Sequence, residues 1–196
     1  MNFIQPDTAN IFSTPVYACQ LDDTVINSEI ISNIKNITWS SPEYWGKTLA
    51  VSSMFNKNDI ENYQFTEFKK ALDTHIALYC KYINFEKVPY TVSSWLTKMD
   101  SGNYGHIHNH AYVDISGVYY VQTNGDDGSI FFESPNQVMA TSYCFNQLSN
   151  RWYVPPKIGK LLIFPGWLNH GITTNTTDST RISLSFNIMF ERTLFK

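Results

Sequence analysis

The sequence predicts a mainly β protein, an antiparallel barrel or sandwich with supporting helices in its N-terminal part. Two observations carry this prediction. The second half of the chain consists of short strand-like runs separated by turns, with no helical pattern between them. The first half holds two helical patterns. Aromatic residues make up 15% of the chain, and such residues are enriched in strands.

The N-terminal part is expected to contain one strand and two helices. Residues 11–21 alternate as a strand does, and residues 22–37 repeat isoleucines at helical spacing. Residues 58–85 predict the strongest helix, because apolar residues follow one stripe of it: Phe68, Leu72, Ile76, Tyr79 and Ile83. His75 lies beside that stripe with no second metal-binding residue type at useful spacing. We therefore expect His75 to be structural.

The second half is expected to contribute the strands of the barrel. Each run is rich in β-branched and aromatic residues and ends at a turn signal. The runs are residues 90–99, 114–123, 129–135, 160–167 and 180–190. Together they predict one domain over residues 1–196, with supporting elements in 1–90 and the β core in 91–196.

Residues 136–158 form the longest stretch without a clear assignment. A long insertion between barrel strands is a natural place for a loop that covers a substrate, and it is also long enough to hold another strand pair. Both interpretations stay open at this point.

Composition narrows the class of partner and the compartment. The net charge is −3, the pI is near 5.9, and no run of Lys and Arg is present, so duplex nucleic acid is not expected as a partner. Three widely spaced cysteines make neither a disulfide framework nor a Cys-x-x-Cys metal site, which suits a reducing cytoplasm. The sequence shows no signal-peptide pattern and no apolar run of membrane-spanning length. We expect a cytoplasmic protein, and the pattern specifies no oligomeric state.

Three histidines stand at every second position in "GHIHNH", at His106, His108 and His110. On an extended segment alternate side chains share a face, so His108 and His110 could reach one ion. Alone, such a pair indicates a metal weakly. A further histidine, His170, directly follows a later apolar strand. The combination favours a metal site over scattered surface histidines.

The last predicted strand has one polar and one apolar face. Arg181, Ser183, Ser185 and Asn187 alternate with four apolar residues. This polar face either meets solvent or lines a cavity inside a barrel. An arginine in a cavity would need a carboxylate, and a bound dicarboxylate would supply one with bidentate geometry.

At these residues the chain resembles the Fe(II)- and 2-oxoglutarate-dependent oxygenases, in particular the prolyl-hydroxylase-like branch and a group of small oxygenases from bacteria and phages. The resemblance spans roughly residues 95–190 and implies a double-stranded β-helix, also called a jelly-roll or cupin-like barrel, with iron at one mouth. The matching stretches are "GNYGHIHNHAYVDISGVYYV" (102–121), "GSIFFESP" (128–135), "GKLLIFPGWLNHGI" (159–172) and "RISLSFNI" (181–188).

The resemblance also implies a reaction and its residues. 2-Oxoglutarate and O2 would be consumed, succinate and CO2 released, and a small-molecule or peptide substrate hydroxylated. His108 occupies the place of the first iron ligand and His170 that of the last. Arg181 matches the residue that pairs with the far carboxylate of 2-oxoglutarate. Tyr120 and Ser183 would support that arginine and the cosubstrate.

The second metal ligand departs from the family pattern, which is His-x-Asp or His-x-Glu followed by a distant His. The carboxylate position holds His110. Either His110 binds and the centre has three histidines, or Asp114 folds back to the metal. We favour the first interpretation because Asp114 lies inside the predicted strand. His106 is expected to be a bystander.

A cupin-type metal protein that does not use 2-oxoglutarate is the alternative. "GNYGHIHNH" also fits the first cupin motif, a glycine followed after five residues by His-x-His. Arg181 separates the two hypotheses, because a cupin has no special need for an arginine eleven residues after His170.

Overall fold

The computed structural model describes residues 13–21, 23–41, 48–52 and 58–192. Its helices are α1 (Asp23–Ile34), α2 (Asp59–Asn62) and α3 (Thr66–Tyr82), with two 3-10 helices later in the chain, η2 (Gln137–Thr141) and η3 (Asn146–Ser149). None of the helices in these ranges is long and apolar enough to cross a membrane.

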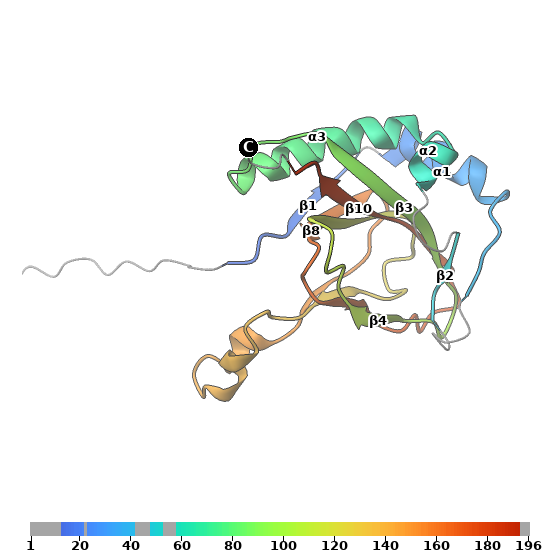
Figure 1. Ribbon diagram of the computed structural model, residues 1–196. Coiled ribbons are helices and arrows are strands. Elements are labelled where there is room, and N and C mark those ends of the chain that lie inside the picture. Colours follow the sequence, from blue (N-terminus) through green and yellow to red (C-terminus); the bar gives the residue numbers. More distant parts are fainter. Residues whose placement is uncertain (1–12, 22, 42–47, 53–57, 193–196) are drawn as a thin grey trace, which may run out of the picture.

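Two antiparallel sheets form the body of the molecule (Figure 1). Within the described residues, the larger sheet has six strands in the order β1 (Tyr17–Gln20), β8 (Lys160–Pro165), β5 (Ile115–Gln122), β10 (Arg181–Phe190), β3 (Tyr90–Met99) and β2 (Ala50–Val51). The smaller has four, in the order β4 (Gly105–His108), β9 (His170–Ile172), β6 (Ile130–Phe132) and β7 (Trp152–Val154). The jelly-roll fold expected from the sequence is confirmed.

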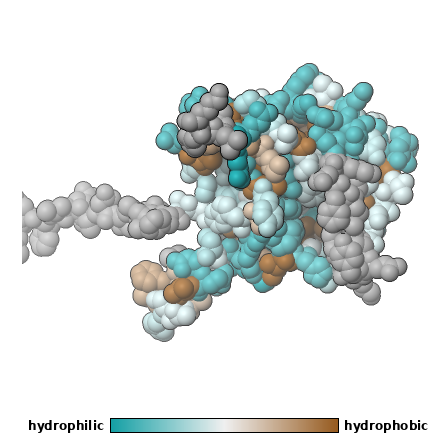
Figure 2. All heavy atoms as spheres, in the orientation of Figure 1, coloured by the Kyte–Doolittle hydropathy of each residue, from teal (hydrophilic) through white to brown (hydrophobic). Residues whose placement is uncertain are grey.

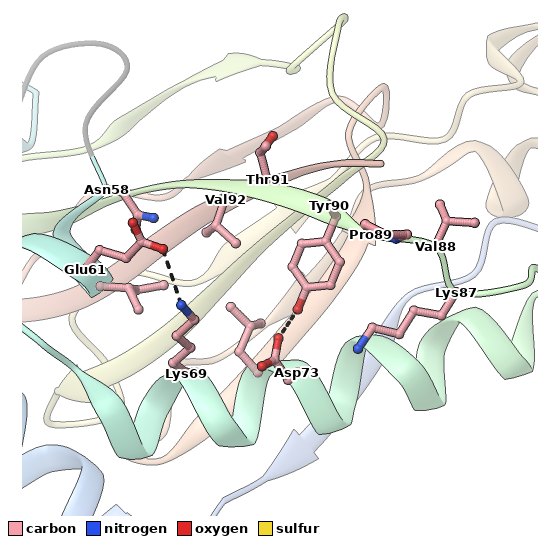
Figure 3. Close-up of a pocket in the computed structure, with 12 residues that line it drawn as sticks. Asn58, Glu61, Lys69, Asp73, Lys87, Val88, Pro89, Tyr90, Thr91 and Val92 are labelled. Carbon is pink, nitrogen blue, oxygen red and sulfur yellow. Dashed lines mark hydrogen bonds and ion pairs between the residues drawn. The ribbon is translucent and has the colours of Figure 1, made fainter. Parts of the chain in front are cut away.

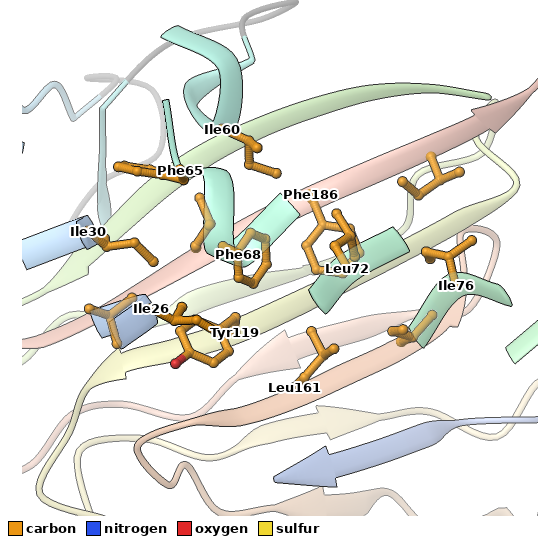
Figure 4. Close-up of a cluster of buried hydrophobic side chains, with 14 of the residues drawn as sticks. Ile26, Ile30, Ile60, Phe65, Phe68, Leu72, Ile76, Tyr119, Leu161 and Phe186 are labelled. Carbon is orange, nitrogen blue, oxygen red and sulfur yellow. The ribbon is translucent and has the colours of Figure 1, made fainter. Parts of the chain in front are cut away.

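The hydrophobic core lies between the larger sheet and the helices on its outer face (Figure 4). The predicted stripe of α3 is buried at Phe68, Leu72, Ile76 and Tyr79, whereas Ile83 at its end is 37% exposed. The Phe68 ring lies 5.2 Å from that of Tyr119 on β5. Each buried side chain of this size contributes about 1.5–3 kcal/mol. Helix packing therefore fixes which face of β5 and β10 is left for the space between the sheets.

The prediction of one helix over 58–85 is wrong, because the chain breaks between α2 and α3. Gln64 has a φ of 55°, in the left-handed region, and Phe65 behind it is fully buried. After this break α3 begins beside α1, where the Thr66 N–H donates to the Glu29 carboxylate at 2.6 Å. The first N–H groups of a helix need such acceptors, and a carboxylate also favours the positive end of the helix dipole.

His75 on α3 lies outside the group formed by His108, His110 and His170, as the sequence predicted. Its Nδ1 is hydrogen-bonded to the Tyr17 hydroxyl of β1 at 2.7 Å. Burial lowers the pKa of His75. The side chain thus joins an edge strand to the helix layer, which is a structural role.

The stretch 136–158 contains both a strand and an arm. Strand β7 pairs with β6, and the segment before it, with η2 and η3, projects from the body (Figure 1). Apolar side chains are exposed on this arm (Figure 2). Among the large residues exposed there are Tyr143, at 99%, and Val138, at 74%. A substrate-covering role for the arm stays a prediction.

Gly117, in the middle of β5, is expected to tolerate no side chain. A Cβ there would lie 2.2 Å from Cζ of Phe186 and 2.5 Å from the Leu162 carbonyl oxygen. Gly117→Ala should therefore destabilise the protein by about 1–3 kcal/mol or more, as overpacking does. Urea denaturation measures the change, with Tyr112→Ala as the control because Tyr112 is 91% exposed. Equal stability of Gly117→Ala and the wild type would contradict this account of the close packing.

Candidate metal and cosubstrate site

A cavity of about 440 Å³ lies between the two sheets. The polar face of β10 lines it at Arg181, Ser183, Ser185 and Asn187, so this face does not form an ordinary solvent surface. The side chains of β3 and β5 that line the cavity include Trp95 and Tyr120. Strand parity explains this arrangement, because the β10 residues that alternate with these polar residues point outward to the helices.

Three histidines meet at one end of this cavity. His108 ends β4 and His170 begins β9, and the two are register partners. His110 follows two residues after β4, held by its backbone N–H, which donates to the Gly166 carbonyl at 2.8 Å. One ligand atom of each imidazole lies within 4.8 Å of the others. Three side chains so placed can bind a single ion from one side.

Hydrogen bonds set the tautomer of two of these imidazoles. Nδ1–H of His108 donates to the His106 carbonyl at 2.8 Å, and Nδ1–H of His170 donates to the Leu168 carbonyl at 2.8 Å. A carbonyl can only accept, so in both rings Nδ1 carries the proton. Nε2 then holds the lone pair that a metal needs.

His110 has a different neighbour behind it. Its Nδ1 lies 3.4 Å from Nδ2 of Asn187, whose Oδ1 accepts a hydrogen bond from the Ser116 hydroxyl at 2.8 Å. The Trp95 ring lies 6.0 Å from the imidazole, centroid to centroid. Ser116 and Asn187 therefore form a polar chain that ends on His110.

The other two candidates of the sequence lie differently. The Asp114 carboxylate accepts a hydrogen bond from the Phe190 N–H at 2.9 Å, and the histidine cluster does not include Asp114. The His106 ring lies 4.9 Å from that of Tyr104, and His106 contributes its carbonyl to His108. His106 thus supports the cluster through its backbone.

Arg181 lies in the same cavity and is only 1% exposed. Its guanidinium donates to the Gly128 carbonyl at 2.6 Å and to Sδ of Met99 at 2.8 Å, and it faces the Tyr120 ring at 5.7 Å. Its Nε has no hydrogen-bond partner, and no carboxylate of the described ranges forms an ion pair with it. Burial of this cation lowers its pKa. A buried arginine so placed is suited to an anionic ligand.

The side chains around Arg181 are neutral donors and acceptors, apart from the buried carboxylate of Asp127. This carboxylate attracts the guanidinium without forming an ion pair and accepts hydrogen bonds from Thr123 and Asn124. Burial raises the pKa of Tyr120 to about 12, so its hydroxyl keeps its proton at neutral pH. Ser183 is buried, and its hydroxyl shares a hydrogen bond of 2.7 Å with that of Thr97. Among the described residues that line the cavity, Arg181 is the only Arg, Lys, Asp or Glu.

Comparison with known families agrees with this geometry. A family model described as "Putative 2OG-Fe(II) oxygenase" matches residues 93–187, the segment that holds the three histidines and Arg181. The chain belongs to the 2OG-Fe(II) oxygenases. No curated protein matches it in sequence.

Solved structures similar to this oxygenase share its fold at low sequence identity. A prolyl-4-hydroxylase of Pseudomonas putida is 11% identical with a TM-score of 0.62, over 92% of this chain and 95% of that one. HygX of Streptomyces hygroscopicus, with nickel and 2-oxoglutarate bound, is 11% identical with a TM-score of 0.62, over 93% and 85%. The epimerase SnoN, in complex with Fe3+ and α-ketoglutarate, is 13% identical with a TM-score of 0.64, over 90% and 79%.

Two residues around the site of this oxygenase were not assigned a role from the sequence. Asn187 reaches His110, and its parity with Arg181 on one strand was a usable signal for a place in the cavity. The Gly128 carbonyl holds Arg181 from a turn between strands. No local sequence pattern predicts such a contact, because the contact depends on how the two sheets pack.

The metal-free oxygenase should lose stability on acidification. Burial, followed by the nearby His108, lowers the pKa of His110 to about 4 and that of His170 to about 3, against 6.5 for a free histidine. Between pH 6.5 and these lowered pKa values, the unfolded chain binds more protons than the folded one. The stabilisation is therefore fully present above about pH 6.5 and is lost as the pH falls toward 4 and 3.

Urea denaturation of the metal-free protein between pH 7 and pH 5 measures this slope. His110→Gln should make it shallower, because one titrating group is removed, while His75 and His170 still contribute in the same direction. An unchanged slope in His110→Gln would show that His110 protonates equally in both states.

Proposed function

We propose that the chain is an Fe(II)- and 2-oxoglutarate-dependent dioxygenase that hydroxylates its substrate and releases succinate and CO2. His108, His110 and His170 would hold the iron, and Arg181 the far carboxylate of 2-oxoglutarate. Tyr120 and Ser183 would complete the wall around that carboxylate. Membership of the family gives the class of reaction, and the contacts of these residues support their roles.

The observation that carries the cosubstrate role is the buried guanidinium of Arg181, which forms no ion pair with a described carboxylate. It is buried with Nε unpartnered, in the cavity that the three histidines close at the other end. Asp127 attracts this buried cation only from beyond ion-pair distance, so the guanidinium can still accept a carboxylate in direct contact, and two carboxylate oxygens match its fork. 2-Oxoglutarate has one carboxylate for this cation and a keto-acid end for the metal.

The metal role fits the donor set, since imidazole is a ligand of iron, zinc, copper and nickel. His110 must bind through Nε2, as the other two do, if Nδ1 carries its proton. The Asn187 amide supplies the acceptor for that proton when its oxygen faces the ring, with its nitrogen turned to Ser116. Asn187 would then orient His110 as a carboxylate or carbonyl orients a metal-binding histidine elsewhere.

The bound iron and cosubstrate would supply the oxidising chemistry, and the protein supplies placement and exclusion of water. His108, His110 and His170 would hold the metal from one side, and the cavity would accept the cosubstrate beside it. The lining of that cavity contains no Asp, Glu or Lys among the described residues, and Arg181 is its one arginine. The part of the substrate that enters it should therefore be uncharged.

The single-domain organisation over 1–196 and the cytoplasmic location stay predictions. Cys19, Cys80 and Cys144 form no disulfide in the described part of the chain. This supports a reducing compartment.

Anaerobic titration of the protein with Fe(II) and then 2-oxoglutarate tests the proposal. Chelation of iron by the keto acid should give a weak visible charge-transfer band that saturates with the cosubstrate. Fully metallated protein without this band would overturn the proposal. Metal binding without 2-oxoglutarate binding would favour the cupin-type alternative.

A further inference from the structure

We propose that the edge of β3 opposite β10 at Tyr90–Ser93, which pairs with no strand of the described residues, docks an extended segment of a polypeptide substrate. This segment adds to the sheet as one more strand and leads into the cavity. The inference rests on the proposed function in taking the docked segment as the substrate. Docking itself depends only on the fold.

One edge of β3 is paired over only part of its length. Toward β10 the pairing runs from Tyr90 to Met99, the whole strand. On the opposite edge β2 pairs only with Lys98 and Thr97, and an isolated bridge reaches Ser94. Between Ser94 and the start of the strand, no backbone of the described ranges pairs with this edge.

The direction of the backbone groups follows from Leu96. Its C=O accepts from the Ser52 N–H at 3.0 Å and its N–H donates to the Ser52 hydroxyl at 2.9 Å, so both groups face away from β10. In an antiparallel strand every second residue directs its groups to the same edge. Tyr90 and Val92 therefore present two N–H and two C=O groups at the open edge. Such a row is the usual template for an added strand.

A groove of about 700 Å³ runs along this edge, between β3 and the helices α2 and α3 (Figure 3). On its helix side Lys69 pairs with Glu61 at 3.3 Å, and Asp73 accepts a hydrogen bond from the Tyr90 hydroxyl. At the far end Nζ of Lys87 lies 5.3 Å from the Tyr90 ring centroid and makes no ion pair with a described residue. The groove has room for side chains of a peptide, with an acidic residue preferred beside Lys87.

The same strand continues from the groove into the metal cavity. Tyr90, Thr91 and Val92 line the groove, whereas Ser93 and Trp95 line the cavity. Ser93 is the register partner of Asn187, which lies 3.4 Å from His110. A peptide paired with Tyr90 and Val92 thus reaches the wall of the cavity where the histidines meet.

An extended polypeptide suits this edge better than a small metabolite does. Alternating donors and acceptors on every second residue match the spacing of another extended backbone. A small molecule entering the cavity alone would make no use of the groove. The occupant is therefore a peptide or an exposed, unfolded segment of a protein.

The test uses a displayed library of short random peptides, selected on the metal-free protein, and backbone amide exchange measured by NMR. Enriched peptides should slow exchange at the Tyr90 and Val92 amides and leave Thr91 and Ser93, which already bond to β10, nearly unchanged. N-methylation along the peptide should weaken binding at least about tenfold at alternate positions only. Selected peptides that protect other amides, or a library that yields no binder, would overturn the docking site.

Two further measurements separate docking from catalysis. Val92→Pro removes one outward N–H at an edge position where proline is tolerated, and it should weaken peptide binding without loss of the 2-oxoglutarate band. With Fe(II), 2-oxoglutarate and O2, a docked peptide should gain the mass of one oxygen atom. A peptide that protects Tyr90 and Val92 but is not oxidised by protein that shows the band would overturn its assignment as substrate. Loss of the band alone would contradict only the proposed function.

Discussion

Arg181→Ala should abolish 2-oxoglutarate binding while the metal content stays near that of the wild type. The guanidinium is the only cation that lines the cavity in the described structure, and nothing else there can neutralise the far carboxylate. Truncating one partner of a buried, hydrogen-bonded charge pair costs about 2–5 kcal/mol, which corresponds to roughly 30-fold to several-thousand-fold weaker binding. Anaerobic calorimetric titration of the metallated variant with 2-oxoglutarate measures the loss.

Two controls make this result specific. Arg181→Lys keeps the charge but loses the planar fork, so it should bind 2-oxoglutarate with intermediate affinity. Urea denaturation of Arg181→Ala should show an intact fold, because removing a buried cation that forms no ion pair relieves its desolvation cost. Equal 2-oxoglutarate affinity in Arg181→Ala and the wild type would mean that another group holds the carboxylate.

The β core could be predicted from the sequence because its strands alternate side chains of different polarity at every second residue. Residues 90–99 form β3 without a change of boundary, and residues 180–190 form β10 with a difference of one residue. In β10 the alternation correctly separates the buried core face from the cavity face. The stripe of α3 likewise predicted the residues that cover the sheet.

Features that depend on contacts distant in sequence were less predictable. The break before α3 depends on burial of Phe65 and on a carboxylate of α1, neither of which changes the local apolar period. The short strands β4 and β9 were not recognised, because their pairing places histidines where a strand pattern would have apolar residues. The partners of His110 and Arg181 depend on the register of the larger sheet and on a turn of the smaller one.

His110→Ala should lose most of its metal, whereas Asp114→Ala should keep it. His110 offers a ligand atom in the group that spans 4.8 Å with His108 and His170. The Asp114 carboxylate is instead held by the Phe190 N–H at 2.9 Å. Removing an outer partner of a metal ligand costs 10- to 100-fold in metal affinity, so removing a ligand should cost at least about 100-fold. Metal content after loading with Fe(II) and desalting under anaerobic conditions gives the comparison.

The order of the two variants in stability should be the reverse of their order in metal loss: Asp114→Ala keeps the metal but should be the less stable protein. Asp114→Ala leaves the Phe190 N–H without its carboxylate and should lower the free energy of unfolding by about 1 kcal/mol. His110→Ala should not destabilise the metal-free protein at low pH, because a histidine held neutral by burial is lost. His106→Ala serves as the matched control, since its backbone carbonyl, which orients His108, remains. If Asp114→Ala lost the metal and His110→Ala retained it, the centre would contain the usual two histidines and a carboxylate, and the Asp114–Phe190 contact would have to open when the metal binds.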